Sequence, residues 1–164
     1  MTKNNVHLND VVGDRASTKK AIRRLITEWK ERLGIKHWTI FVTFARSSNM
    51  ADCYAEPEYF KGFLNFYMKR VLEDVQTMYD LEELVVHELC HCVSWELVAL
   101  TERLVEQSND ETGELDTLVS RREEELVSTM SHGLVMAKYG LREVPETVRL
   151  RGWENKEKCK KSNK

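Results

Sequence analysis

The pentapeptide at residues 87–91 constrains this chain most, because it reads H-E-L-C-H. On an α-helix, residues four apart lie one above the other on the same face, so the imidazoles of His87 and His91 can both reach one metal ion. Glu88 follows the first histidine directly, so its carboxylate can reach a water molecule bound to that ion. The pattern therefore predicts a Zn²⁺ site in which Glu88 is the general base for hydrolysis of an amide bond.

The residues around the motif predict a helix. Asp80, followed three residues later by Glu83, is typical of a capping box at a helix start, which puts the motif in the second and third turns. Apolar residues follow at an approximately helical period: Leu81, Leu84, Val85, Leu89, Cys92 and Val93. A buried structural helix could carry one histidine on such a face, but two histidines at this spacing with the intervening glutamate favour a metal site.

A catalytic zinc needs a third protein ligand and keeps its fourth position for water. The extended H-E-x-x-H-x-x-G-x-x-H motif is excluded, because Ser94 and Leu97 stand where it has glycine and histidine. The next histidine, His132, falls on a later predicted helix. We therefore expect a carboxylate as the third ligand.

A second helix from about Leu115 to Tyr139, ended by Gly140 and Pro145, can supply that carboxylate. Its apolar residues form a stripe at helical spacing: Leu126, Val127, Met130, Leu134 and Ala137.

Three consecutive glutamates lie in this helix. At about 100° per residue, Glu123 falls near the centre of the stripe, Glu124 at its edge and Glu125 toward solvent. A carboxylate on an apolar face needs a cation, so Glu123 is the expected third ligand, with Glu124 as the alternative. The other interpretation is a solvated charge run that pairs with Arg121 and Arg122.

The whole pattern predicts an α+β fold with a small antiparallel sheet. Residues 1–16 are expected to be a disordered N-terminus, residues 17–145 a single domain and residues 146–164 a basic tail. The elements are a helix at 18–33 with Gly34 at its C-terminal cap, strands at 38–44, 51–54 and 61–68 with a turn at 56–58, the motif helix and the glutamate helix. The strand at 62–68 is expected to flank the cleft, where a peptide could add to it through main-chain hydrogen bonds.

Composition indicates a cytoplasmic protein without a membrane span. The N-terminus MTKNNVHLND has no apolar signal core, and no run of 18 apolar residues exists. Four cysteines form no disulfide framework. Cys90 and Cys92 flank His91, and we interpret both as small buried hydrophobic residues rather than zinc ligands.

Charge is uneven along the chain. The net charge is −2, but the segment from Arg149 to Lys164 holds seven basic and two acidic residues, a local +5, which leaves −7 for the preceding 148 residues. Such a tail is either a solubilising end or a weak contact to nucleic-acid phosphates. Trp153 within it could stack on a base or dock the tail on the domain.

The order L-G-I-x-x-W-x-I, then L-E-E-L-V-V-H-E-L-C-H, then E-E-E-L-V resembles that of small phage-type zinc metallopeptidases, which are minimal gluzincins related to SprT-like proteases. The resemblance covers about Leu25 to Ala137. The stretch that ends at Trp95 is similar to the H-E-x-C-H-x-x-x-W segment of SprT-like proteases. Those proteins use a third histidine in a G-H-G-type stretch that is absent here, so their DNA–protein-crosslink substrate is not carried over.

The resemblance implies a zincin-like fold, with His87, His91 and Glu123 or Glu124 as ligands. It also implies the host cytoplasm as location if a phage encodes the chain. It supplies no substrate.

Residues and resemblance together predict a zinc-dependent metallopeptidase, a hydrolase that acts on a protein or peptide. Glu88 would take a proton from the zinc-bound water and pass it to the leaving amine. Tyr79, His132 and Tyr139 are candidates for stabilising the oxyanion. The alternative is a zinc-stabilised phage binding protein for a host protein or nucleic acid, with little or no turnover. Glu88 favours the enzyme, because a purely structural site has no need of it.

Overall fold

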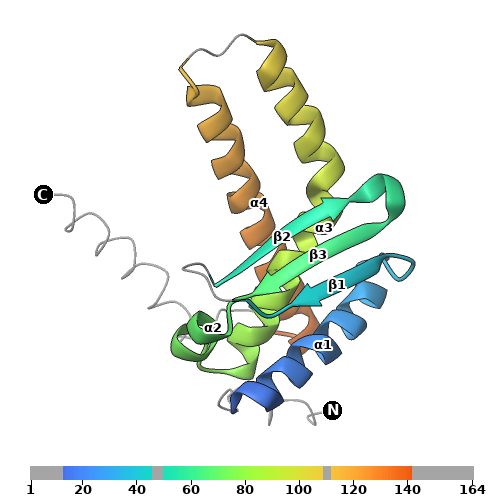
Figure 1. Cartoon of the computed structure of the whole chain (residues 1–164), viewed down its shortest axis with the longest axis vertical. Helices are drawn as coiled ribbons and strands as arrows, with labels where there is room; N and C mark the ends of the chain where they lie inside the picture. The colour runs from blue at the N-terminus through green and yellow to red at the C-terminus, as the bar shows by residue number, and fades with distance from the viewer. Residues whose placement is uncertain (1–12, 46–49, 109–111, 142–164) are drawn as a thin grey trace, which may run out of the picture.

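The computed structural model describes residues 13–45, 50–108 and 112–141 (Figure 1). The predicted tail at 146–164 lies outside the described residues. The elements are α1 (Arg15–Arg32), β1 (Thr39–Thr43), β2 (Ala51–Glu56), η1 (Pro57–Tyr59), β3 (Lys61–Phe66), α2 (Met68–Asp74), α3 (Met78–Gln107) and α4 (Glu114–Tyr139). Helices and one small sheet make this an α+β architecture, as the sequence predicts.

Helix α1 begins earlier than expected. Its N-cap is Asp14, whose side chain accepts hydrogen bonds from the backbone N–H groups of Ala16 and Ser17. The helix therefore starts at Arg15, inside the segment predicted to be disordered, while residues 1–12 of that segment lie outside the described residues. The predicted glycine end is confirmed, because Gly34 follows the helix with φ of +74°. The apolar face of α1 packs into the core through Ile22, Leu25, Ile26 and Trp29.

The sheet is mixed, so the prediction of an antiparallel sheet is wrong. Strand order is β1–β3–β2; β3 runs antiparallel to β2 and parallel to β1. The parallel pair arises because β2 goes to the far edge and β3 then inserts between the two earlier strands. Apolar alternation sets which face of a strand is buried, and it carries no information about this order.

The position of β3 also overturns the expected peptide-binding strand. Both edges of β3 are paired, so it cannot accept a further strand. Among the three strands, β2 makes the most extensive contact with α3. Within the described residues, β2 pairs only with β3, so its other edge is the one that remains for main-chain hydrogen bonds.

Helix α3 begins one turn before the predicted cap. Thr77 is the N-cap, and its side chain and that of Asp80 form a reciprocal capping box; the predicted pairing of Asp80 with Glu83 is wrong. The motif consequently falls in the third and fourth turns of a 30-residue helix. By length and composition α3 could cross a membrane, but the core helix of a soluble protein passes the same test, and 44% of its most apolar window is buried inside the protein.

Helix α4 packs against α3 and buries a face that is rotated from the predicted stripe. Its fully buried positions are Val127, Ser131 and Val135, which are four residues apart, whereas Leu126 is 43% exposed. The predicted end at Gly140 is confirmed by its left-handed conformation. The C-terminal half of α3 and the N-terminal half of α4 project beyond the sheet as a helical hairpin (Figure 1).

A buried carboxylate joins the three long helices at the other end of the molecule. Glu82 of α3 is 2% exposed and accepts hydrogen bonds from the indole N–H of Trp29 (2.5 Å), the Lys138 ammonium and the Tyr139 hydroxyl. Lys138 also pairs with Glu28 at 2.8 Å. These bonds satisfy a charge that would otherwise be costly to bury, and they fix α4 against α1 and α3.

Candidate metal centre

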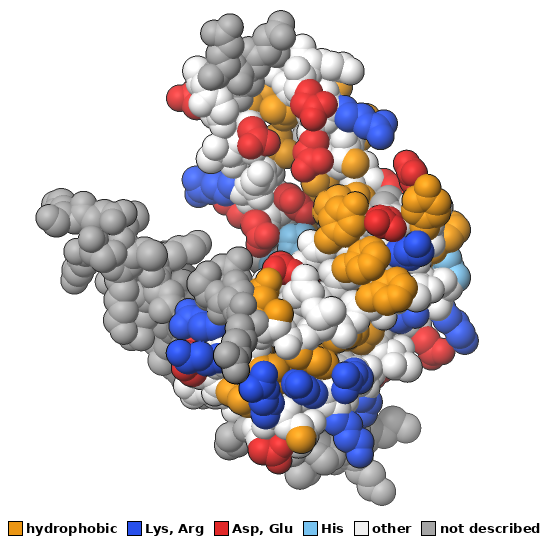
Figure 2. Space-filling model, in the orientation of Figure 1, with side chains coloured by type: hydrophobic (Ala, Val, Ile, Leu, Met, Phe, Trp, Pro, Cys, Tyr) orange, Lys and Arg blue, Asp and Glu red, His pale blue; other side chains and the backbone are white. Residues whose placement is uncertain are grey.

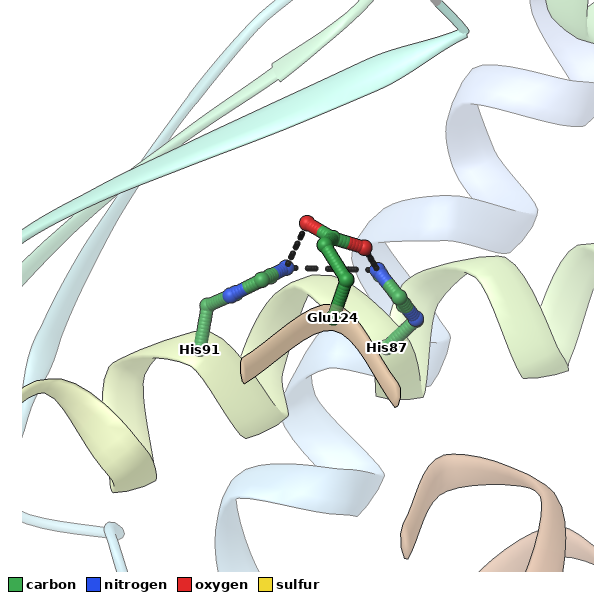
Figure 3. A group of neighbouring side chains, drawn as sticks. All are labelled: His87, His91 and Glu124. Atoms are coloured by element: carbon green, nitrogen blue, oxygen red, sulfur yellow. Dashed lines mark hydrogen bonds and ion pairs between the residues drawn. The ribbon is translucent and has the colours of Figure 1, made fainter. Parts of the chain in front are cut away.

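Three side chains from two helices converge beside β2 (Figure 3). His87 and His91 project from α3, and Glu124 projects toward both from α4. The Nε2 atoms of the two histidines are 3.2 Å apart. Glu124 Oε2 lies 3.4 Å from Nε2 of His87, and its Oε1 lies 3.4 Å from Nε2 of His91.

These distances fit a single zinc ion. Ligand atoms held at 2.0–2.1 Å in a tetrahedron are about 3.3–3.4 Å from one another. The two Nε2 atoms are 3.2 Å apart, and each lies 3.4 Å from a different oxygen of the Glu124 carboxylate, so these separations are close to that edge length. Two imidazoles and one carboxylate are also a donor set that zinc accepts while keeping a fourth position open.

The predicted third ligand, Glu123, lies elsewhere. Its Oε1 is 2.9 Å from Nδ1 of His91, the ring nitrogen that points away from Glu124. When Nδ1–H donates to this carboxylate, the lone pair of Nε2 is left for a metal. The structure therefore brings the alternative, Glu124, into the group and gives Glu123 the position of a partner that orients His91.

The rotation of the buried face of α4 explains why Glu124, rather than Glu123, faces the Nε2 atoms of the two histidines. With Val127, Ser131 and Val135 as the buried stripe, Glu124 lies about 20° from its centre and Glu123 about 80°, at 100° per residue. This angle directs Glu124 toward α3, although its side chain is 60% exposed and that of Glu123 is 19% exposed. Glu125 points to solvent as predicted, where it pairs with Arg121 (3.1 Å) and Arg122 (2.6 Å).

The motif glutamate is buried and electrostatically strained. Glu88 is 4% exposed, and its pKa is raised to about 8, mainly by burial and further by the carboxylates of Glu124 and Asp52. A carboxyl group with a pKa near neutrality can both accept and release a proton at physiological pH.

The pKa of His87 is lowered, first by burial and then by the neighbouring His91. A lowered pKa keeps the imidazole neutral, which is the form that binds a metal.

Sequence reasoning missed Asp52, an acidic residue on β2 that raises the pKa of Glu88. Its Oδ1 accepts a hydrogen bond from Asn65 at 2.7 Å, and its Oδ2 accepts one from the Tyr67 hydroxyl. No motif marks this residue, because its place depends on β2 lying beside α3.

Two of the three candidates for oxyanion stabilisation lie away from this group. Tyr79 lies eight residues before His87, about 12 Å along the helix axis, and Tyr139 donates a hydrogen bond to Glu82 at the same end of α3. His132 lies nearer, since its Nδ1 is 2.9 Å from Glu83, one turn before His87.

The predicted burial of the motif cysteines is confirmed, since Cys90 and Cys92 are 0% and 1% exposed. Neither is among the three side chains, His87, His91 and Glu124, that could hold a metal ion. Cys92 Sγ instead lies 3.4 Å from Sγ of Cys53 on β2, which fixes the strand against α3. An apolar cavity of about 280 Å³ lies between α3 and α4 in the hairpin, and Glu123 and Leu126 lie on its wall.

Comparison with known proteins identifies no relative. No protein-family model, no curated protein and no solved structure matches this chain.

Proposed function

We propose that the protein is a zinc-dependent metallopeptidase. The observation that carries the proposal is the convergence of two imidazoles and one carboxylate. His87 Nε2 and His91 Nε2 are 3.2 Å apart, and each lies 3.4 Å from one oxygen of Glu124, which is close to the separation of ligand atoms around a zinc ion. The buried Glu88 beside this group is the general base that such a centre needs and that a structural zinc site does not.

His87, His91 and Glu124 would hold the ion. When bound, zinc supplies Lewis acidity, which polarises the scissile carbonyl and makes water acidic enough to deprotonate near neutral pH. Glu88 accepts the proton of the attacking water and donates it to the leaving amine. Glu123 holds the His91 ring in one tautomer and one orientation.

The elements around the three side chains favour a peptide as the substrate. Strand β2 runs beside α3 at the group, and its edge away from β3 pairs with no other strand among the described residues. An extended peptide can add to such an edge through main-chain hydrogen bonds, which are independent of its sequence. A peptide bound in this way would have one of its backbone amide bonds, the bond to be cut, beside His87 and His91.

The test compares zinc content and peptide hydrolysis in the wild type and in Glu88→Gln. We expect about one zinc per chain in both proteins, and a rate of hydrolysis of a peptide mixture about 10²–10⁴-fold lower in the variant. His87→Ala should lose both properties. Glu125→Gln, which changes an exposed glutamate next to the group, should change neither.

Two results would contradict the proposal. One is a wild-type rate in zinc-loaded Glu88→Gln. The other is zinc-loaded wild type that hydrolyses no peptide, which would favour a zinc-stabilised binding protein instead.

A further inference from the structure

A second cavity, of about 530 Å³, lies between β2, η1 and the C-terminal part of α3. Its volume is within the range of sites that hold small ligands or large side chains. None of its lining residues belongs to the candidate metal centre.

The cavity lies along the line of contact between β2 and α3, which we call the seam, and the candidate metal centre lies beside the same two elements. Along this seam Cys53 meets Cys92, and the ring of Tyr54 meets that of Trp95 edge-to-face at 5.5 Å. Residue numbers rise together on both sides, so β2 and α3 run side by side in the same direction. Trp95 follows His91 by one turn, about 6 Å along the helix axis.

Aromatic side chains form one part of the cavity wall. Tyr54, Tyr59 and Trp95 line it, and the two tyrosines are 51% and 66% exposed. The faces of such rings attract cations, more strongly where water is partly excluded.

Carboxylates form another part. Glu56, Glu58 and Glu96 line the cavity against a single basic residue, Arg103. Glu58 and Glu96 make no ion pair with any described residue, so their charge is available to a ligand. Figure 2 shows further acidic side chains around the hollow beneath the helical hairpin. Negative potential along the seam favours a cationic ligand.

One corner of this region already holds an ammonium group. Lys61 Nζ lies 5.2 Å from the centroid of the Tyr59 ring and 3.8 Å from Glu56 Oε2. The pair is partly exposed and weak, but it has the combination of ring face and carboxylate that an external cation would use. Tyr54, Trp95 and Glu96 remain for that ligand.

We propose that this cavity is a subsite for the side chain of a lysine or arginine residue in a bound peptide. The inference rests on the proposed function for where the scissile bond lies. Along α3 the cavity begins one helical turn from His91, at Trp95, and extends about two turns further, to Arg103, while an extended chain advances about 3.3 Å per residue. The basic residue therefore falls two to five positions from the bond that is cut.

Binding is measured by calorimetry with zinc-loaded Glu88→Gln, so that turnover does not interfere. The probes are the blocked pentapeptide Ac-Ala-Ala-Lys-Ala-Ala-NH₂ and the same peptide with norleucine in place of lysine. We expect the lysine peptide to bind at least about ten-fold more tightly. Adding Tyr54→Ala or Glu96→Gln should weaken it by about three- to thirty-fold and leave the norleucine peptide unchanged. Glu106→Gln, on the same helix outside the cavity, is the matched control.

Equal binding of the two peptides, or no effect of either cavity variant, would overturn the subsite. Failure of the proposed function has a different signature: the wild type cuts no peptide, yet the lysine preference and its loss in the variants persist. If the wild type cuts peptides with no preference for a basic residue at a fixed distance, the subsite fails and the hydrolase stands.

Discussion

Glu123 Oε1 lies 2.9 Å from Nδ1 of His91, while Glu124 Oε1 lies 3.4 Å from Nε2 of the same ring. Two consecutive glutamates of one helix thus face the two nitrogens of one imidazole. Carboxylates that hold the far nitrogen of a metal-binding histidine fix its orientation, and their removal weakens metal binding without abolishing it.

The first prediction follows from this division. Glu123→Ala should lower zinc affinity by about 10- to 100-fold. Glu124→Ala should lower it further, because it removes a ligand, and Glu125→Ala should leave it unchanged. Competition with a chelating dye measures all three. If Glu123→Ala loses zinc completely while Glu124→Ala keeps it, the assignment is reversed.

The second prediction concerns the buried Glu82. Replacing it by glutamine leaves the Lys138 ammonium, 14% exposed, with Glu28 as its carboxylate partner and weakens the bonds to Trp29 and Tyr139. We expect a loss of about 3 kcal/mol in the free energy of unfolding, at the low end for a broken buried pair. Urea denaturation of zinc-free protein measures it. Glu31→Gln, which removes an exposed charge, should change stability by less than about 0.5 kcal/mol.

The third prediction concerns the contact between β3 and the motif helix. A Cβ at Gly62 would lie 2.8 Å from Cys92 Sγ and 2.8 Å from Ile40 Cδ1. Gly62→Ala should therefore cost about 1–3 kcal/mol of unfolding free energy. In a double-mutant cycle, Cys92→Ala should relieve part of that cost.

The matched control is Gly133→Ala in α4. A Cβ there meets nothing within 4 Å, and the residue is exposed within a helix. It should stabilise the protein by about 0.5–1 kcal/mol. Equal destabilisation at both glycines would show that the close approach to Cys92 is not the cause.

The fourth prediction is a pH dependence of the zinc-free protein. Glu88 has its pKa raised from 4.5 to about 8 in the folded chain. Between these values the folded state holds a proton that the unfolded state has released. The stabilisation that protonated Glu88 contributes to the folded state is therefore complete below pH 4.5 and is lost as the pH rises through about 8.

The melting temperature of chelator-treated wild type should consequently fall from about pH 5 to about pH 8 relative to that of Glu88→Gln. The difference between the two proteins removes the contribution of the other titrating groups. Parallel curves for the two proteins would contradict the raised pKa of Glu88.

The sequence alone predicted the three long helices α1, α3 and α4, because each has a long apolar period, but it did not predict the short helix α2, which begins at Met68 within the predicted strand 61–68. Gly34 and Gly140 end their helices in the left-handed conformation as expected. The motif also located one candidate site, since a four-residue spacing has only one geometry on a helix.

Two features depended on contacts that no local pattern encodes. Strand order is decided when β3 inserts between β1 and β2, and no local pattern of these strands specifies that step. The choice between Glu123 and Glu124 turns on the rotation of α4. Counting Leu126, which is 43% exposed, as a core residue displaced the expected centre of the buried stripe.

The helical hairpin separates the two halves of the centre along the chain. Both imidazoles are on α3 and both partner carboxylates are on α4, with about 30 residues between His91 and Glu124, so an ion held by all three would close a long loop. A chain divided between Gln107 and Glu114 would give one fragment that carries the imidazoles and another that carries the carboxylates. Reassembly of the two fragments would then respond to zinc concentration, and the divided protein would report free metal through complementation.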